Sequence, residues 1–281
     1  MQTASTAEKL KRFRSLHGAG GAFLMPNAWD AGSARLLASL DFPALATTSA
    51  GLAFALGLRD STGSVTREAA LANARAIVEA TDLPISADLE NGLGPLPEDC
   101  AQTLREAEAV GLCGAAFEDA SGDPDRPIYD FGHAVERIEA VVAAKTNPDF
   151  MVTARSENFL YGRPDLDDTI KRLQAFEKAG ADVVYAPGLP DIESVRAVCQ
   201  AVSVPVNVLG GLTNAAYTVE DLSEAGVRRI STGASLARAA RGEMMRGARE
   251  LRDTGTFEYA KRAIPDAEAS QHMRVSPPAR G

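Results

Sequence analysis

Short apolar runs alternate with longer amphipathic segments along most of the chain. Several runs are almost continuously apolar, which is typical of parallel strands that are buried on both faces. The eight candidate strands are Ala22–Met25, Ala44–Thr48, Ile85–Leu89, Gly114–Glu118, Met151–Ala154, Val183–Ala186, Val206–Leu209 and Arg229–Thr232. Apolar residues at helical spacing predict helices between them, including Arg67–Thr81, Leu96–Val110, Asp167–Ala179 and Ile192–Ala201. This alternation predicts an α/β fold, specifically a (β/α)₈ TIM barrel.

A repeated local pattern supports this architecture. The stretches AVGLCGAAF, KAGADVVY and EAGVRRIS each combine the end of a helix, a glycine and a short strand. The glycines are Gly111, Gly180 and Gly226, and glycine is favoured directly after a helix, where the backbone turns left-handed. The pattern is the αβ half of a βαβ unit, recurring around the barrel.

No linker and no shift in composition divides the 281 residues before about residue 240. We therefore expect a single barrel domain over 1–281, with its core at about 20–240. An extra C-terminal helical segment is expected at about 241–264, and it could be swapped between subunits. The tail over 265–281 has little periodicity and is expected to be an arm or a disordered segment.

The net charge of the chain limits the classes of partner that it can bind. It carries 38 acidic and 29 basic residues, a net charge of −9, and no block of lysine or arginine. Phosphate backbones repel an acidic protein, so no nucleic-acid partner is expected. No run of about 18 apolar residues occurs, so no membrane span is expected.

The N-terminal stretch lacks the apolar core of a secretory signal. The cysteines are Cys100, Cys113 and Cys199, an odd number without metal-ligand spacing. Reduced thiols in a cytoplasmic protein fit this pattern better than a disulfide framework.

Acidic residues are concentrated where the predicted strands end. In a barrel of this kind the chemistry lies at the carboxyl ends of the strands. Asp60, Asp88, Glu90, Glu118 and Asp119 would therefore meet at one mouth. Such a group repels itself unless a divalent cation neutralises it, and carboxylate oxygens suit Mg²⁺ or Mn²⁺. The alternative is that these acids are helix caps and solvated loop residues.

Polar and small residues at other strand ends suggest how an anion could be held. Arg155 can bind a carboxylate through two parallel hydrogen bonds, or it can form a salt bridge with a neighbouring acid. Ser49–Gly51 could present backbone amides from a small-residue turn. Gly210, Gly211 and Gly233 follow the last two strands, where many barrels bind phosphate, although they could serve simply as turns.

Taken together, these segments resemble the isocitrate lyase/phosphoenolpyruvate mutase superfamily, from about Phe23 to about Gly233. The resemblance is carried by TSAGLA (48–53), LGLRD (56–60), ADLENGLG (87–94), AFED (116–119) and TARSENF (153–159). It implies a (β/α)₈ barrel, often with a final helix swapped between subunits of a homodimer or homotetramer. It also implies Mg²⁺ and a small-molecule 2-oxo or 2-hydroxy acid as substrate.

The resemblance implies roles for individual positions. Asp88 matches the direct metal ligand, and Glu90 and Glu118 match acids that act directly or through water. Asp60 matches a nearby acid of the catalytic centre, and Arg155 matches the arginine that clamps the substrate carboxylate. The remaining substrate-binding positions are the loop Ser49, Ala50, Gly51 and Leu52, the pocket wall at Trp29, and Asn207 after the seventh strand.

The chain also departs from the family pattern. The third strand ends in Asp88-Leu89-Glu90, where the family usually has Asp-Ala-Asp. The loop over 119–138 has neither the cysteine nor the lysine of the family's gating loops, and Cys113 would lie at the opposite end of the barrel. An isocitrate lyase, a methylisocitrate lyase or a phosphonomutase in the strict sense is therefore not expected. Tyr129 and His133 are candidates for the missing acid/base, or ordinary loop-packing residues.

The functional hypothesis rests on the features that the members of this family share, namely a metal ion, a 2-oxo acid and stabilisation of an enolate. We expect a Mg²⁺-dependent lyase that cleaves a C–C bond of a 2-oxo or 2-hydroxy (di)carboxylic acid through a stabilised enolate. Retro-aldol cleavage and oxaloacetate-type decarboxylation both fit. The alternatives are a non-catalytic barrel that binds a 2-oxo acid, a phosphoenolpyruvate/phosphonate mutase-like enzyme, and a phosphate-binding barrel enzyme.

Overall fold

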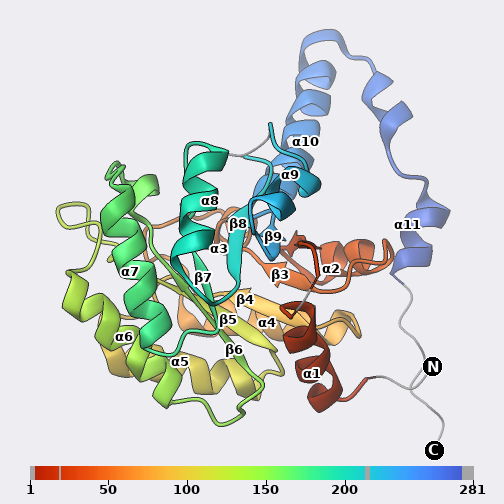
Figure 1. Ribbon diagram of the computed structural model, residues 1–281. Helices are drawn as coiled ribbons and strands as arrows, with labels where there is room; N and C mark the ends of the chain where they lie inside the picture. The colour runs from red at the N-terminus through yellow and green to blue at the C-terminus, as the bar shows by residue number, and fades with distance from the viewer. Residues whose placement is uncertain (1–3, 19, 213–215, 274–281) are drawn as a thin grey trace, which may run out of the picture.

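A ring of short parallel strands surrounded by helices forms the body of the molecule (Figure 1). The computed structural model describes residues 4–18, 20–212 and 216–273, so the last part of the predicted tail, 274–281, lies outside the described residues. Every strand pair is parallel, and the order around the sheet is β1-β9-β8-β7-β6-β5-β4-β3-β2. The predicted (β/α)₈ TIM barrel is confirmed.

Eight of the nine strands fall at the eight predicted positions, and the additional strand, Asn27–Ala28, lies just beyond the first of them. The nine strands are β1 (Phe23–Met25), β2 (Asn27–Ala28), β3 (Leu45–Thr47), β4 (Ile85–Asp88), β5 (Gly114–Glu118), β6 (Met151–Arg155), β7 (Val183–Tyr185), β8 (Val206–Leu209) and β9 (Arg229–Ser231). The first predicted strand, Ala22–Met25, corresponds to β1, and Pro26, which has no N–H to donate to a ladder, separates it from the unpredicted β2. β1 pairs with β9 and β2 pairs with β3, so the two ends of the strand order are consecutive in the chain.

The helices that follow the strands cover the outside of the ring. They are α2 (Ala31–Ala38), α3 (Ser49–Ala55), α4 (Arg67–Ala80), α5 (Pro97–Ala109), α6 (Phe131–Ala143), α7 (Leu166–Lys178), α8 (Ile192–Ala201), α9 (Val219–Glu224) and α10 (Ser235–Thr254). A short 3₁₀ turn, η1 (Asn158–Tyr161), follows β6. Gly111, Gly180 and Gly226 have φ of 88°, 100° and 99°, which confirms the predicted glycine stops.

A helix that precedes the barrel closes its amino-terminal end. Helix α1 (Thr6–Leu16) is capped by Ser5, and its buried Phe13 packs edge-on against His17, with ring centroids 4.9 Å apart. His17 in turn packs against Phe23 of β1 at 5.0 Å. The opposite end, where the strands terminate, stays open for a ligand.

The C-terminal segment leaves the barrel and returns to it. Helix α10 projects outward in Figure 1, and the chain then turns back through η2 (Glu258–Arg262) to α11 (Asp266–His272). The described part of the tail, for which an arm or a disordered segment was expected, contains the short helix α11. Arg35 of α2 donates to the carbonyl of Met273, which holds the end of this arm against the barrel.

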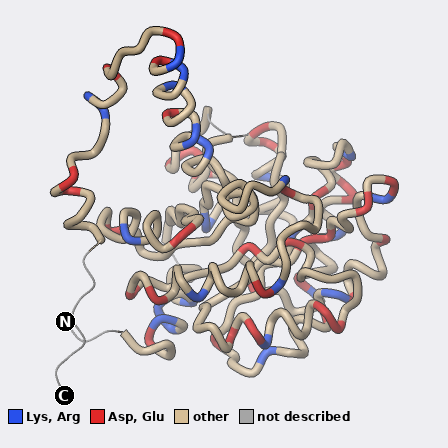
Figure 2. The backbone as a smooth tube through the Cα atoms, turned by 180° about the vertical axis from the view of Figure 1, so that it is seen from behind, with Lys and Arg blue, Asp and Glu red and all other residues tan. Residues whose placement is uncertain are grey.

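Two surface properties bear on partners. No helix in the described ranges is both long and apolar enough to cross a lipid bilayer. Acidic and basic positions are interspersed over the outer helices in the view of Figure 2.

Candidate active site

A cavity of about 380 Å³ opens at the carboxyl ends of the strands. Residues from most strands line it, including Asn27, Thr47, Asp88, Ala116, Arg155, Tyr185, Asn207 and Ser231. The interior positions below the mouth are small, with Ala46, Ser86 and Ala116 on three neighbouring strands. These small side chains leave space inside the barrel, where larger residues would normally fill it.

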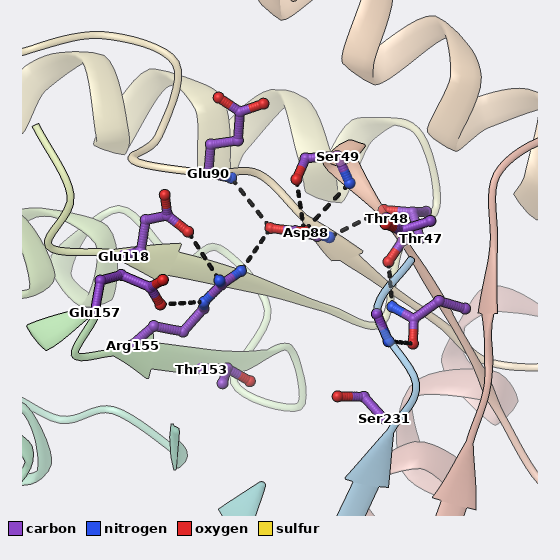
Figure 3. A network of polar contacts seen from close by, with 12 residues as sticks. Thr47, Thr48, Ser49, Asp88, Glu90, Glu118, Thr153, Arg155, Glu157 and Ser231 are labelled. Atoms are coloured by element: carbon purple, nitrogen blue, oxygen red, sulfur yellow. Dashed lines mark hydrogen bonds and ion pairs between the residues drawn. The ribbon is translucent and has the colours of Figure 1, made fainter. Parts of the chain in front are cut away.

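Arg155 lies at the centre of the acidic residues, at the last position of β6 (Figure 3). Its Nη1 donates to Asp88 Oδ1 at 2.8 Å, and its Nη2 lies 3.0 Å from Glu118 Oε2. Its Nε donates to Glu157 Oε1 at 2.9 Å. The guanidinium also lies over the ring of Tyr185, 5.1 Å from the centroid. The clamp predicted from the sequence is therefore held in place by acids from three different strand ends.

Asp88 is bound on its other side by helix α3. Ser49 donates to Asp88 Oδ2 through its backbone N–H at 3.2 Å and through its hydroxyl at 2.9 Å. The predicted Ser49–Gly51 loop is in fact the first turn of α3, because Thr48 caps the helix by accepting from the Gly51 N–H at 3.3 Å. The expected amides are therefore helix N-terminal amides, and one of them already holds a site carboxylate.

Glu90 carries an uncompensated carboxylate. Its backbone is left-handed, with φ of 48°, which is uncommon for a residue other than glycine. Its N–H donates to Asp88 Oδ1 at 3.4 Å, while its carboxylate points away from Arg155 in Figure 3. Burial and the nearby charges of Asp88 and Asp60 raise the pKa of Glu90 to about 7.

The neighbouring acids share this excess of negative charge. Burial raises the pKa of Glu118 well above its ordinary value, although Arg155 opposes the shift. Burial and the charge of Asp88 raise the pKa of Asp60. Burial also raises the pKa of Glu157. One guanidinium thus binds three of five neighbouring carboxyl groups, an arrangement that a further cation would stabilise.

The donor chemistry of this group fits a divalent cation. Several carboxyl oxygens lie close together here, and the Glu90 carboxylate accepts no hydrogen bond from the described part of the chain, which suits a cation that prefers oxygen ligands, such as Mg²⁺. Within the described ranges, however, no three acidic, histidine or cysteine side chains converge as a ready-made metal centre. The reason is that Arg155 lies between Asp88 and Glu118 and engages both.

Asp119 does not join the group, contrary to the expectation. It is buried behind the strand ends, where it accepts from the N–H of Glu157 at 2.8 Å and from Arg172 Nη1 at 3.1 Å. Successive residues of an extended chain point to opposite faces, so Glu118 and Asp119 cannot both face the cavity.

Tyr129 and His133 also lie away from the cavity, which corrects their candidacy as its acid/base. Their rings pack edge-on against each other at 5.0 Å, and Arg137 covers the Tyr129 ring at 4.4 Å. His133 Nε2 lies 3.1 Å from the carbonyl oxygen of Pro95, two residues before the start of helix α5. Both side chains therefore pack in the α5–α6 region, outside the main cavity lining.

The predicted substrate-binding residues divide into two groups. Ser49, Ala50 and Asn207 line the cavity. Trp29, Gly51 and Leu52 do not line it. Trp29 packs behind α3, where a β-carbon at Gly51 would lie 2.8 Å from Trp29 Cβ. Leu52 is buried with Ala53 and Val65 in a small separate apolar cluster.

Several cavity residues were not anticipated. Tyr185, the last residue of β7, lines the main cavity. Glu157, which follows Arg155 by two positions, does not line it but binds Arg155 Nε, and both residues stood at strand ends in the sequence. Arg229 and Arg238 line the same cavity from β9 and α10. Tyr161, with Ser61, Glu90 and Glu118, lines a neighbouring cavity of about 150 Å³.

Comparison with known proteins places this architecture in a family. The family model for phosphoenolpyruvate phosphomutase matches residues 13–252. A crystal structure of a Burkholderia cenocepacia J2315 protein described as a lyase/mutase is 47% identical, with a TM-score of 0.92 and coverage of 96% of this chain and 97% of that one.

Two curated proteins extend the comparison. An uncharacterised Mycobacterium tuberculosis protein, Rv1998c, is 31% identical over 264 residues, covering 93% of this chain and 95% of that protein. The 2-methylisocitrate lyase of Escherichia coli K12 is 31% identical over 180 residues, 61% of this chain and 60% of the lyase. The chain therefore belongs to the phosphoenolpyruvate phosphomutase family and is an enzyme of the isocitrate lyase/phosphoenolpyruvate mutase type.

Proposed function

We propose that the protein is a Mg²⁺-dependent lyase that cleaves a C–C bond in a 2-oxo or 2-hydroxy (di)carboxylic acid. The observation that carries this proposal is the position of Arg155, between Asp88 and Glu118 at the wall of the cavity. A guanidinium held this way is oriented for a carboxylate ligand, and the acids around it have affinity for a cation.

Substrate binding would rearrange the pairs around Arg155. Asp88, Glu118 and Glu90 would hold the cation, and Asp60 lies close enough to Asp88 for their charges to interact. Arg155, released in part from Asp88 and Glu118, would then hold the carboxylate of the substrate. Glu157 keeps the guanidinium oriented through its bond to Nε, which leaves both terminal nitrogens for the ligand.

The bound Mg²⁺ would supply a Lewis acid for the charge that develops on the enolate oxygen. The protein would orient the substrate. Tyr185 is buried and packs against the Arg155 guanidinium, and Asn207 and Ser231 add polar side chains to the cavity lining. Tyr161 is our candidate for returning a proton to the product. Its phenol lies beside Glu118 and Ser61, and burial raises its pKa, which keeps the proton on the oxygen at neutral pH.

The reaction can be identified with a defined set of substrates. Purified protein is incubated with Mg²⁺ and oxaloacetate, 2-methylisocitrate or substituted malates, and the release of pyruvate or glyoxylate is followed. We expect turnover of at least one compound and its loss on treatment with a chelator. Asp88→Asn, which preserves the side-chain shape, should abolish the metal-dependent turnover.

The outcomes separate the competing functions. Tight binding of pyruvate or 2-oxoglutarate without any turnover would identify a non-catalytic 2-oxo acid-binding barrel. Conversion of a phosphonate or of phosphoenolpyruvate alone would identify a mutase-like enzyme. Full activity of Asp88→Asn would show that the metal assignment is wrong.

We also propose that the enzyme is a homodimer or homotetramer. Helix α10 and the turn after it expose Met244, Met245 and Phe257 at 64%, 45% and 69%. Apolar side chains gathered on a projecting segment favour a subunit contact. Light scattering of the purified protein tests this, and a monomer at micromolar concentration would refute it.

A further inference from the structure

Arg229 is a buried cation inside the barrel, at the first position of β9, with an exposed fraction of 2%. Its Nε donates to Asn207 Oδ1 at 2.8 Å, and its Nη2 donates to Thr153 Oγ1 at 2.9 Å. Its Nη1 lies 3.3 Å from His17 Nε2. All three partners are neutral groups, and the same guanidinium lines the main cavity.

The neutral state of His17 follows from its surroundings. Burial and the charge of Arg229 lower the pKa of His17 to about 3. Its Nδ1 lies 2.9 Å from the Phe13 carbonyl oxygen and so carries the proton, leaving Nε2 to accept from Arg229. The histidine therefore orients Arg229 without balancing its charge.

The other buried arginines of the described chain have different hydrogen-bond acceptors. Arg172 bonds to the carboxylates of Asp119 and Asp168. Arg137 donates to backbone carbonyls of Asn91, Gly94 and Pro95 and lines none of the cavities described above. Arg229 combines three properties: it is buried, it faces a cavity, and no carboxylate lies within salt-bridge distance in the part of the chain that the structure describes.

A buried charge without a counter-charge is costly, so such a group in a cavity indicates a site for an anion. A guanidinium carries five N–H donors, and the contacts described here use three of them. Burial also lowers the pKa of Arg229 to about 9. An anionic ligand group would supply both the charge and the remaining acceptors.

The position of Arg229 relative to Arg155 suggests what the anion is. Thr153, which accepts from Arg229, precedes Arg155 by two residues in β6, so both side chains point into the barrel, one below the other. Two residues of a strand advance about 7 Å, which roughly matches the separation of the two carboxylates of a four- or five-carbon diacid bound between two guanidinium groups.

We propose that Arg229, oriented by Asn207 and Thr153, forms an anion subsite in the floor of the cavity, which binds the second carboxylate of a dicarboxylic substrate. This inference rests on the proposed function, because the first carboxylate is taken to lie at Arg155. The subsite makes the enzyme selective for dicarboxylates over monocarboxylates of the same 2-oxo or 2-hydroxy type.

The test compares ligands that differ in the second carboxylate. Calorimetry with Mg²⁺ present measures the Kd of malate, of lactate and of oxalate, which is too short to reach Arg229. Wild-type protein should bind malate at least about tenfold more tightly than lactate. Arg229→Met should remove most of that preference and leave the Kd of lactate and oxalate within about twofold.

Asn207→Asp is the matched variant, and it keeps the shape of the network. The new carboxylate would lie beside Arg229 Nε, neutralise the subsite and raise the melting temperature. The malate preference should fall as in Arg229→Met. This variant carries the test if Arg229→Met does not fold.

The results separate the two proposals. If wild-type protein with Mg²⁺ does not bind oxalate, the proposed function is wrong, and the subsite proposal falls with it. If oxalate binds but the malate-to-lactate ratio is the same in wild type and both variants, the subsite alone is refuted. In that case Arg229 has a purely structural role.

Discussion

Two arginines near the carboxyl ends of the strands hold carboxylates, yet their surroundings differ in one decisive respect. Arg172 pairs with Asp119 and Asp168 and also donates to the carbonyl of Tyr129. This cluster is closed, and neither Arg172 nor Asp119 lines the main cavity. Arg155 pairs with Asp88, Glu118 and Glu157, but it faces the cavity.

The balance of charge explains the difference. In the Arg172 cluster, two carboxylates share one guanidinium, and Asp119 accepts a further backbone N–H. In the Arg155 cluster, Glu90 and Asp60 add two carboxyl groups that Arg155 does not bind. Burial raises the pKa of Asp119 to about 7 as it does that of Glu90, so the excess of carboxyl groups, and not the pKa shift, distinguishes the two clusters. A closed ion pair stabilises a fold, whereas an open cluster with excess charge retains affinity for a ligand or cation.

The largest expected effect is on turnover. Arg155→Met should lower kcat/KM by about a thousandfold, because the substrate carboxylate loses its charged partner. Steady-state kinetics on the substrate found above measures it, and circular dichroism checks the fold. A loss below about tenfold would show that Arg155 balances the acids without binding substrate.

The second effect concerns stability. Arg172→Met leaves two carboxylates without their cation, one of them fully buried, and should lower the free energy of unfolding by about 3 kcal/mol. The kcat of the folded protein should remain close to that of wild type. Urea unfolding and kinetics measure the two quantities. A selective loss of kcat with unchanged stability would contradict the division between the two clusters.

The third effect is on metal affinity as the pH changes. Glu90 must lose its proton to bind Mg²⁺, and its pKa is about 7. The affinity should therefore increase from pH 6 to pH 8, by about tenfold if one proton is released. Calorimetry at both pH values measures it. Glu90→Gln should bind more weakly and show a flatter profile, and an unchanged profile would exclude Glu90 as the group responsible.

The smallest effect is expected outside the cavity. Tyr129→Phe and His133→Ala remove side chains that pack in the α5–α6 region, so kcat should stay within about twofold of wild type. Tyr161→Phe provides the contrast and should reduce kcat by about a hundredfold if its phenol returns the proton. A large loss in His133→Ala with Tyr161→Phe unaffected would reverse this assignment.

Much of the architecture could be predicted because it depends on local patterns. Apolar runs such as Gly114–Glu118 and Val206–Leu209 coincide with β5 and β8, and helix α8 has the predicted bounds. The proximity of Asp88, Glu90, Glu118 and Arg155 could be predicted because strand ends in a barrel meet at one face. The sequence shows which residues stand at the ends of strands, and residues at those positions lie close together in a barrel.

Other parts depended on contacts that no local pattern encodes. Ser49–Gly51 is a helix start because Thr48 caps it. Tyr129 and His133 both lie in the loop predicted over 119–138, but helix α6 begins at Phe131 within it. Because α6 packs against α5, both side chains lie away from the mouth. Loop residues are the least constrained by periodicity, so their direction follows from packing.

The sequence by itself determined the strands, the glycine stops, the family and the acidic centre around Arg155, because each follows from spacing along the chain. Only the tertiary structure decided which charges are balanced. It turned Asp119 toward Arg172 and brought Arg229 under the cavity beside His17, a residue 212 positions away. Burial and distance between remote residues set the energy of a charge, and the fold alone establishes both.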